Sequence, residues 1–324
     1  MTESLNITCY KCKSENVKQE EGGAFRCQNC EQQFYIFETD PSTLNEIQNC
    51  FLKFNFTSVK QLESLAPKGA GFERGDIVHA GFHAYYLLQM EGMDWVERKR
   101  KALAFAEMKA AESQLEVEDI MNVLESIKQY FDYYKADSWK PLVVEHCFRK
   151  LVYEDDELKL ILSGKIDMKV DTGPRNNNLE LPVDHKSGID VAPNELSNQF
   201  MAYSHVSKSN LFCVNKVGFQ KTVPMDKKFK RHIIPYTPDL LEHWLKNSIW
   251  WIKMALFCME NSSFPQNFTS CDKYSGCQFK PVCYSKPSNM EFKLQSLFKK
   301  RDKPWDPATA DLPREELLKV LEKL

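Results

Sequence analysis

Apolar residues recur at three- and four-residue spacing through much of residues 42–136, which predicts a mostly helical region. The helices expected there are Glu73–Met90, Trp95–Glu112 and Val117–Tyr134. Asp40-Pro41-Ser42 precedes the region and combines a helix-capping side chain with a proline suited to a first helical turn. We therefore expect the helical region to begin near residue 42.

The pattern changes at Pro141, where partial alternation of Val, Leu and Ile begins and predicts three consecutive antiparallel strands. These strands are Pro141–Tyr153, Leu158–Val170 and Leu179–His185. The elements expected after them are a helix near 194–208, strands near 211–220 and 232–235, and a long helix near 238–259. The predicted class is therefore α/β, with a mixed sheet flanked by helices.

The two ends of the chain differ from this central part. Residues 1–38 are rich in cysteine and contain two strand-like segments, Ala24–Cys27 and Gln33–Phe37. Residues 291–324 form a polar tail that ends in an amphipathic segment, Pro313–Leu324. The domains expected are a zinc ribbon at 1–38, a main domain at 42–290 and the tail at 291–324. Within the main domain we expect a helical part at 42–136, a catalytic sheet at 141–236, and a final helix with a cysteine segment at 238–290.

Composition narrows the class of protein. Hydrophobic residues make up 43% of the 324 residues, so a sizeable core can form, and the net charge is −2. The chain is not a basic nucleic-acid wrapper, so any DNA binding depends on local patches such as Lys221–Arg231 and Lys299–Lys303, or on metal ions. Such basic runs are usually solvated faces. No secretory signal or membrane span is evident, so we expect a soluble, intracellular protein.

The eleven cysteines include two Cys-x2-Cys pairs, Cys9/Cys12 and Cys27/Cys30. This paired spacing places four thiolates where tetrahedral Zn2+ binds, and it predicts a small zinc ribbon whose folding depends on the metal. The ribbon is either a structural cap or a docking element for DNA or protein. The basic residues available for docking are Lys11, Lys13, Lys18 and Arg26.

An acidic group stands out in the predicted sheet. Asp167 follows Gly164 on the second strand, and Asp184 stands near the end of the third. Adjacent antiparallel strands bring the two carboxylates together, as oxygen ligands of Mg2+ require. Lys186, two residues after Asp184, lies on the same strand face and can reach a scissile phosphate or an attacking water.

The Asp-x-Lys spacing is weak on its own. It recurs in this chain, for example at Asp226/Lys228 and Glu157/Lys159, where surface charge is the simpler interpretation. The context of Asp184 is different, because it follows an apolar strand and has Gly-x-Ile-Asp on the strand before it.

These residues carry a family resemblance. Over about residues 55–285 the chain resembles the RecB-like branch of the PD-(D/E)XK nucleases, which includes CRISPR-adaptation nucleases and many viral exonucleases. Five features in family order carry the resemblance: Gly75-x3-His79, Glu145, Gly164-Lys165-Ile166-Asp167, Asp184-His185-Lys186-Ser187-Gly188, and Gln199-x3-Tyr203. The implied fold is the restriction-endonuclease-like core.

The resemblance also implies roles at the matching positions. His79, Asp167 and Asp184 would bind Mg2+ or Mn2+, and Lys186 would orient water or stabilise the transition state. Glu145 would support the metal shell or strand pairing. Gln199 and Tyr203 would face the active-site strands and DNA, although core packing is the alternative for Tyr203.

The cysteines near the C-terminus form Cys271-x5-Cys277-x5-Cys283. Many RecB-like nucleases hold a [4Fe–4S] cluster with three cysteines here and a fourth upstream of the histidine helix. This chain departs from that pattern, because the first gap is longer than usual and Ala66 stands where the fourth cysteine is expected. Cys50 and Cys258 are substitutes. The other outcomes are a different metal or a metal-free remnant.

The sequence thus favours a Mg2+- or Mn2+-dependent deoxyribonuclease. Exonuclease activity is favoured over site-specific cleavage, because no sequence-reading domain is evident beyond the ribbon. The family association points to DNA replication, recombination or processing, in a viral setting among others, with proteins of those processes as partners. The alternatives are a catalytically silent DNA-binding protein that kept the fold, and a subunit active only within a larger complex.

Overall fold

The computed structural model describes residues 7–20, 24–174, 177–188, 193–273, 276–303, 306–307 and 312–324. The chain divides into two compact units. Unit one comprises Met1–Pro67, Phe148–Gly164 and Asp239–Asp306, and unit two comprises Lys68–Cys147, Lys165–Pro238 and Pro307–Leu324. The paired strands β5 (Lys140–Glu154) and β6 (Leu158–Asp171) contribute residues to both units.

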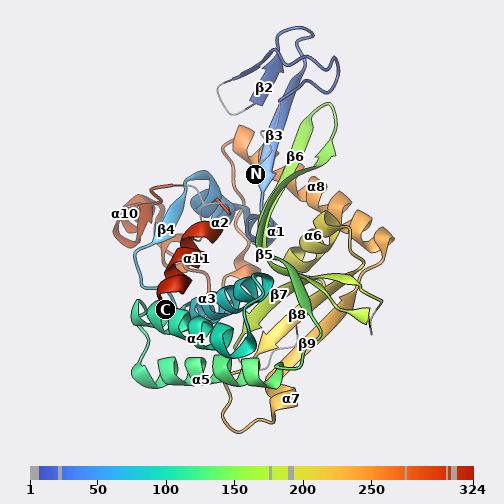
Figure 1. Ribbon diagram of the computed structural model, residues 1–324. Helices are drawn as coiled ribbons and strands as arrows, with labels where there is room; N and C mark the ends of the chain where they lie inside the picture. Colours follow the sequence, from blue (N-terminus) through green and yellow to red (C-terminus); the bar gives the residue numbers. More distant parts are fainter. Residues whose placement is uncertain are drawn as a thin grey trace. The chain divides into compact units, whose positions relative to one another are not determined.

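Unit one begins with the segment that contains the first four cysteines and three short strands (Figure 1). They are β1 (Val17–Gln19), β2 (Ala24–Cys27) and β3 (Gln33–Thr39). Strand β2 pairs antiparallel with β1 and with β3. Strand β3 also pairs in parallel with the first part of β6, from Tyr35 opposite Leu158 to Thr39 opposite Leu162. The third ribbon strand is therefore also a strand of the main sheet.

The rest of unit one is mostly helical. Its elements are α1 (Pro41–Asn49), α2 (Phe51–Phe54), a π-helix (Asn55–Val59), β4 (Leu62–Ser64), α8 (Pro238–Glu260), a 3-10 turn (Phe268–Ser270), α9 (Lys280–Cys283), α10 (Pro287–Leu297) and β10 (Phe298–Lys300). The Asp40 side chain caps α1 as its sequence predicts, accepting from the Ser42 N–H at 2.7 Å. Strands β4 and β10 pair antiparallel, and a small aromatic core formed by Phe56, Phe279 and Phe298 lies beside them.

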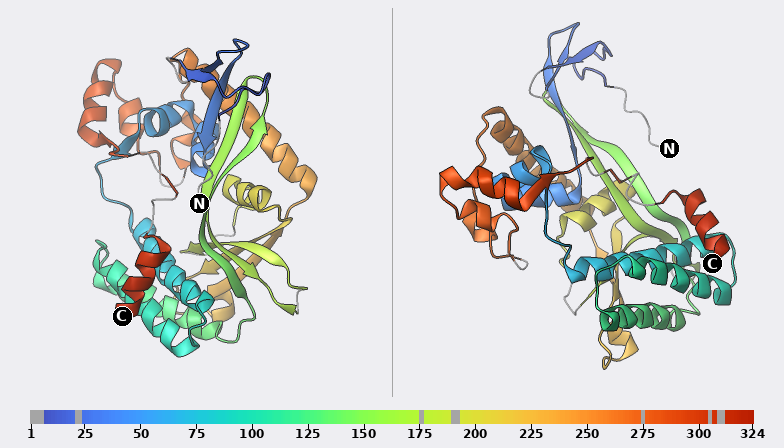
Figure 2. Two further views of the ribbon diagram at one scale, coloured as in Figure 1. Left: turned by 45° about the horizontal axis from the view of Figure 1, so that its top comes forward. Right: turned by 90° about the vertical axis from the view of Figure 1, so that its left-hand side faces the viewer.

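Unit two contains the helical layer and most of the mixed sheet. Its remaining elements are α3 (Ala70–Met90), α4 (Trp95–Ala111), α5 (Val117–Tyr133), β7 (Glu180–Ser187), α6 (Asn198–Ser207), β8 (Leu211–Val217), α7 (Met225–Lys228), β9 (Phe229–Pro235) and α11 (Arg314–Lys323). Helices α3, α4 and α5 lie side by side as one layer (Figure 2).

The sheet of unit two follows the strand order β6-β7-β8-β9. Strand β7 pairs antiparallel with β6 and parallel with β8, and β9 pairs antiparallel with β8, so the sheet is mixed. Buried residues of α3, α4 and α5 pack against the sheet in one core that includes Phe82, Phe131 and Met168. Helix α6 packs on β8 through Phe200, which stacks on Phe212 with 4.9 Å between the ring centroids.

The terminal helix α11 belongs to the core of unit two. Leu317 and Leu321 are each 1% exposed and join the core that α3, α4 and α5 build. The Lys101 ammonium donates to the carbonyl of Leu321 at 2.5 Å, which satisfies a carbonyl at the helix C-terminus. The amphipathic pattern of Pro313–Leu324 therefore marks a packed helix.

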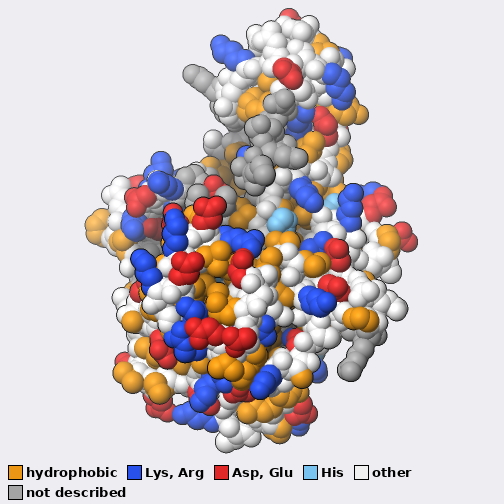
Figure 3. Space-filling model, viewed as in Figure 1, with side chains coloured by type: hydrophobic (Ala, Val, Ile, Leu, Met, Phe, Trp, Pro, Cys, Tyr) orange, Lys and Arg blue, Asp and Glu red, His pale blue; other side chains and the backbone are white. Residues whose placement is uncertain are grey.

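The distribution of charged side chains on the surface is consistent with the net charge of −2. On the face that Figure 3 shows, basic and acidic side chains are interspersed. Among the described residues, no helix is long and apolar enough to cross a membrane.

Candidate active site and metal centres

The two aspartates singled out in the sequence lie together in unit two. The antiparallel pairing of β6 with β7 ends at Met168 opposite Val183, and Asp167 and Asp184 are the next residues of the two strands. Both carboxylates are buried, at 6% and 1% exposed. Asp167 Oδ2 accepts from the backbone N–H of His185 at 2.6 Å.

Burial alone would raise the pKa of both aspartates, but their neighbours differ. His79, His185 and the His185 N–H overcome burial and lower the pKa of Asp167. Burial and the nearby charge of Asp167 raise the pKa of Asp184 to about 6, despite the opposing effect of Lys186. The pair therefore holds more negative charge than its surroundings offset, which suits a cation.

His79 and Glu145 complete a set of close ligand atoms. His79, on α3, places Nδ1 3.6 Å from Asp167 Oδ2. One ligand atom each from His79, Glu145 and Asp167 lie within 4.8 Å of one another, so one divalent cation fits among them. The sequence suggested only a supporting role for Glu145. In the structure, its carboxylate lies close to the ligand atoms of His79 and Asp167.

Glu145 reaches this position through an unusual backbone. Its φ of 49° lies in the left-handed region, although it stands inside β5. Such a conformation costs about 1–3 kcal/mol for a residue with a side chain, and strain of this kind gathers at functional sites. Burial and the charge of Asp167 raise the pKa of Glu145 to about 7.

Lys186 is held between two partners at the edge of the carboxylates. Its Nζ lies 2.9 Å from Asp184 Oδ2 and donates to Gln199 Oε1 at 2.9 Å. The Gln199 amide donates in turn to Asp184 Oδ1 at 2.9 Å and to the Tyr203 hydroxyl at 3.4 Å. Ser197 caps α6 and starts the helix at the point where Gln199 faces β7. The structure thus brings together the residues that the Gln-x3-Tyr motif contributes.

No role was predicted for His185 from the sequence, and the structure buries it at 3% exposed. Its ring stacks on Tyr86, with 5.7 Å between centroids and 5° between planes, and Asn215 lies 2.8 Å from its Nδ1. Asn215 also donates to the Tyr130 hydroxyl at 2.9 Å. Burial lowers the pKa of His185 to about 3, so the ring is neutral. Strand alternation is the available signal, because the residue between Asp184 and Lys186 must face the helical layer.

The ribbon cysteines form a compact set in unit one. The sulfurs of Cys9, Cys12, Cys27 and Cys30 all lie within 4.8 Å of one another. The Sγ–Sγ distances are 3.5 Å between Cys9 and Cys30 and 3.4 Å between Cys12 and Cys27. Tetrahedral Zn2+ with Zn–S bonds of about 2.3 Å needs sulfurs roughly 3.8 Å apart, so the four thiols fit one zinc ion.

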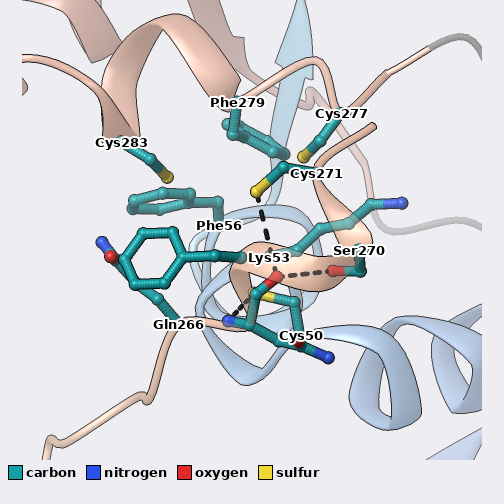
Figure 4. A pocket seen from close by; sticks show the side chains of 11 residues that line it. Cys50, Lys53, Phe56, Gln266, Ser270, Cys271, Cys277, Phe279 and Cys283 are labelled. Atoms are coloured by element: carbon teal, nitrogen blue, oxygen red, sulfur yellow. Dashed lines mark hydrogen bonds between the residues drawn. The ribbon is translucent and has the colours of Figure 1, made fainter. Parts of the chain in front are cut away.

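A second group of four cysteines lines one pocket of unit one (Figure 4). Cys271, Cys277 and Cys283 lie around the pocket, and Cys50, between α1 and α2, is the fourth. The pocket has about 330 Å3 of empty space, part of it open to solvent. Burial, followed by the nearby Cys277, Cys50 and Cys271, raises the pKa of Cys283 to about 11.

The two candidates for the upstream cysteine differ in their relation to this pocket. Cys258 is buried on α8 and is not among the described residues that line the pocket, whereas Cys50 is. The backbone N–H of Asn267 donates to Cys50 Sγ at 3.5 Å, and Cys271 Sγ donates to the Asn267 carbonyl at 3.8 Å. Asn267 therefore ties the two sulfur-bearing segments together.

A mixed sheet flanked by helices, with carboxylates and lysines together at the strands β6 and β7, is consistent with a nuclease-type hydrolase. The sequence profile of the PD-(D/E)XK nuclease superfamily matches residues 40–284, more than half of the 324-residue chain. The chain belongs to this superfamily, whose members use divalent metals. The resemblance and the fold class predicted from the sequence are confirmed.

Two solved structures are similar to this chain. One is a "Putative exonuclease" from Eubacterium rectale, with 14% identity, 84% of this chain and 93% of that chain covered, and a TM-score of 0.44. The other is a protein called SSO0001, with 11% identity, 64% and 85% covered, and a TM-score of 0.31. No curated protein matches the chain in a sequence comparison.

The raised carboxyl pKa values predict that metal stabilises the protein in a pH-dependent way. The pKa values of Asp184 and Glu145, about 6 and about 7, lie above those of ordinary carboxyl groups, so the stability that these two groups contribute to the metal-free fold is lost as pH rises from about 4 through 7. Cations bind the deprotonated groups, so Mn2+ should raise the melting temperature little at pH 5.5 and most at pH 8. Calorimetry with and without Mn2+ measures this. An equal rise at both pH values, or the same rise in the Asp184→Asn protein, would contradict it.

Proposed function

We propose that this protein is a Mg2+- or Mn2+-dependent deoxyribonuclease that degrades DNA from its ends. The observation that supports it best is Lys186, which lies 2.9 Å from Asp184 and 2.9 Å from Gln199 beside the group of His79, Glu145 and Asp167. A cation-holding carboxylate set with an adjacent fixed ammonium is the arrangement that phosphodiester hydrolysis requires.

The proposed roles combine the family resemblance with the geometry. The resemblance implies His79, Asp167 and Asp184 as metal ligands, and Glu145 is added because its ligand atom lies within 4.8 Å of those of His79 and Asp167. A bound divalent cation would supply charge neutralisation and an activated water. Lys186 donates to a phosphate oxygen or to the attacking water. Gln199 keeps Lys186 and Asp184 at a fixed spacing through its two amide atoms. Tyr203 is 5% exposed, which favours packing behind Gln199 over direct contact with DNA.

Degradation of end-labelled linear DNA tests the function. Single- and double-stranded substrates are incubated with Mg2+ or Mn2+, with a closed circle as the substrate that has no ends. We expect loss of linear DNA only, with the circle spared and the Lys186→Ala protein inactive. Cleavage of the circle would replace the exonuclease with an endonuclease. No cleavage with any metal would favour a silent DNA-binding protein or a partner-dependent subunit.

Zn2+ is the proposed ion of the ribbon, and a [4Fe–4S] cluster is the proposed group of the second cysteine pocket. Four thiolates are the usual ligands of such a cluster, and Cys50, Cys271, Cys277 and Cys283 line one pocket. Among the described residues, no three of these cysteines have sulfurs that all lie within 4.8 Å of one another. Sulfurs that are farther apart than this suit a cluster better than a single ion.

Cys50→Ala should remove the cluster from the protein. The wild type, purified without oxygen, is expected to be brown, with absorbance near roughly 400 nm and about four iron atoms per chain. The variant should lose both signals, because the other three pocket cysteines leave one iron without a thiolate. Cys258→Ala is the matched control, since Cys258 is also buried in unit one but lies outside the pocket lining. A colourless wild type that contains only zinc would rule out the cluster.

A further inference from the structure

A second lysine lies at the same carboxylates as Lys186. Lys165 stands two residues before Asp167 on β6, so strand alternation places both side chains on one face. The printed sequence of β7 places Lys186 two residues after Asp184 in the same way, so each of the two strands carries an aspartate and a lysine at i, i+2 spacing.

Each lysine contacts a different buried carboxylate. Lys165 Nζ lies 2.7 Å from Glu145 Oε2, and Lys186 Nζ lies 2.9 Å from Asp184 Oδ2. The side chain of Lys165 is 22% exposed and that of Glu145 is 10% exposed, so the ion pair is partly shielded from solvent. A carboxylate oxygen of Glu145 also lies within 4.8 Å of the ligand atoms of His79 and Asp167. Lys165 thus holds a positive charge beside the place where a divalent cation fits.

Charge balance indicates what this second ammonium does. Asp167, Asp184 and Glu145 carry three negative charges when ionised, and Lys186 with one divalent cation offsets all three. A phosphodiester then adds one negative charge, and attack by hydroxide adds another in the transition state. Stabilising that charge requires further positive groups already in place. Lys165 supplies one such positive group. A cation bound at Glu145 would neutralise the carboxylate that now pairs with Lys165, so the Lys165 ammonium would be available to the phosphate.

We propose that Lys165 is a second phosphate-binding lysine, which contacts a non-bridging oxygen of the substrate phosphodiester on the β6 side while Lys186 acts on the β7 side. This inference rests on the proposed nuclease function. The four-carbon stem of Lys165 gives Nζ the freedom to turn from Glu145 to the phosphate.

Lys165→Met tests the proposal by cleavage kinetics and by DNA binding. Removal of one hydrogen-bond donor to a transition-state oxygen lowers kcat by about 10²-fold. We expect that loss at saturating Mg2+, weaker binding of labelled DNA with Ca2+ in place of Mg2+, and partial recovery in Lys165→Arg. Lys169→Met is the matched control, since Lys169 lies on the same face of β6 and pairs with Glu180 at 2.9 Å. It should stay within twofold of wild type.

Making Lys165→Met in the Glu145→Gln protein separates phosphate binding by Lys165 from support of the Glu145 carboxylate. It also avoids leaving that carboxylate unpaired. If Lys165 binds phosphate, its removal still weakens DNA binding in the Glu145→Gln protein. If Lys165→Met has no further effect there, or if extra metal restores its activity, Lys165 only positions Glu145 and the proposal is overturned. Wild type that cleaves DNA alongside a fully active Lys165→Met protein defeats this inference alone. Wild type that neither cleaves nor binds DNA defeats the proposed function as well.

Discussion

Asp184→Asn is expected to lower the rate of DNA cleavage by at least about 10³-fold, equivalent to about 4 kcal/mol of transition-state stabilisation. Asparagine keeps the shape of Asp184 and can still accept from the Gln199 amide, which lies 2.9 Å from Asp184 Oδ1. It cannot offset the charge of Lys186 or of a bound cation. The loss should therefore fall on chemistry and metal binding, with the fold retained.

Single-turnover cleavage of a labelled oligonucleotide with Mg2+ measures this effect, and the melting temperature reports on folding. Asp226→Asn is the matched control, because Asp226 is exposed on α7 and precedes Lys228 at the same Asp-x-Lys spacing. It should cleave at the wild-type rate. A loss of less than tenfold in Asp184→Asn would mean that the cation is held without this carboxylate.

Cys27→Ser should release the ribbon metal and unfold the ribbon. Cys27 is fully buried, and the only other buried residues of the small core around it, among those that the structure describes, are Cys9 and Phe34. A structural zinc ion in such a segment contributes about 10–16 kcal/mol of binding free energy, which the hydrophobic contacts of the ribbon cannot replace. We expect zinc content to fall from about one ion per chain to none.

Limited proteolysis locates the unfolding, because an unfolded ribbon exposes new cleavage sites within residues 7–39. Cys258→Ser is the control, since it changes a buried cysteine of the same unit that lies outside both cysteine groups. It should keep its zinc and its protease resistance. A Cys27→Ser protein that retains one zinc ion and resists the protease would show that the four thiols do not hold the metal.

Much of the fold was accessible from local pattern. The periodicity of Glu73–Met90 corresponds to α3, and that of Val117–Tyr134 to α5, within a few residues at each end. Asp167 and Asp184 were predicted to meet because their strands are consecutive, and the two residues directly follow the last paired positions of β6 and β7. Short-range signals succeed here because periodicity, capping and hairpin pairing each depend on neighbours in sequence.

The parts that sequence could not supply depend on long-range contacts or on strain. Cys50 joins a pocket with residues more than 200 positions away, and nothing in its local sequence distinguishes it from Cys258. The left-handed φ of Glu145 is equally hidden, because glutamate has no preference for that conformation. His185 lies between two motif residues, yet its contacts with Tyr86 and Asn215 come from other elements of unit two.

The parallel pairing of β3 with β6 affects how this protein can be cut for experiments. The superfamily match begins at residue 40, directly after β3 ends at Thr39. A truncation at that boundary would strip Leu158–Leu162 of the strand that satisfies its backbone N–H and C=O groups. The bared segment reads Leu-Lys-Leu-Ile-Leu, an apolar β-prone edge of the kind that recruits other chains into aggregates. A soluble nuclease fragment should therefore begin before Gln33 and keep the strand.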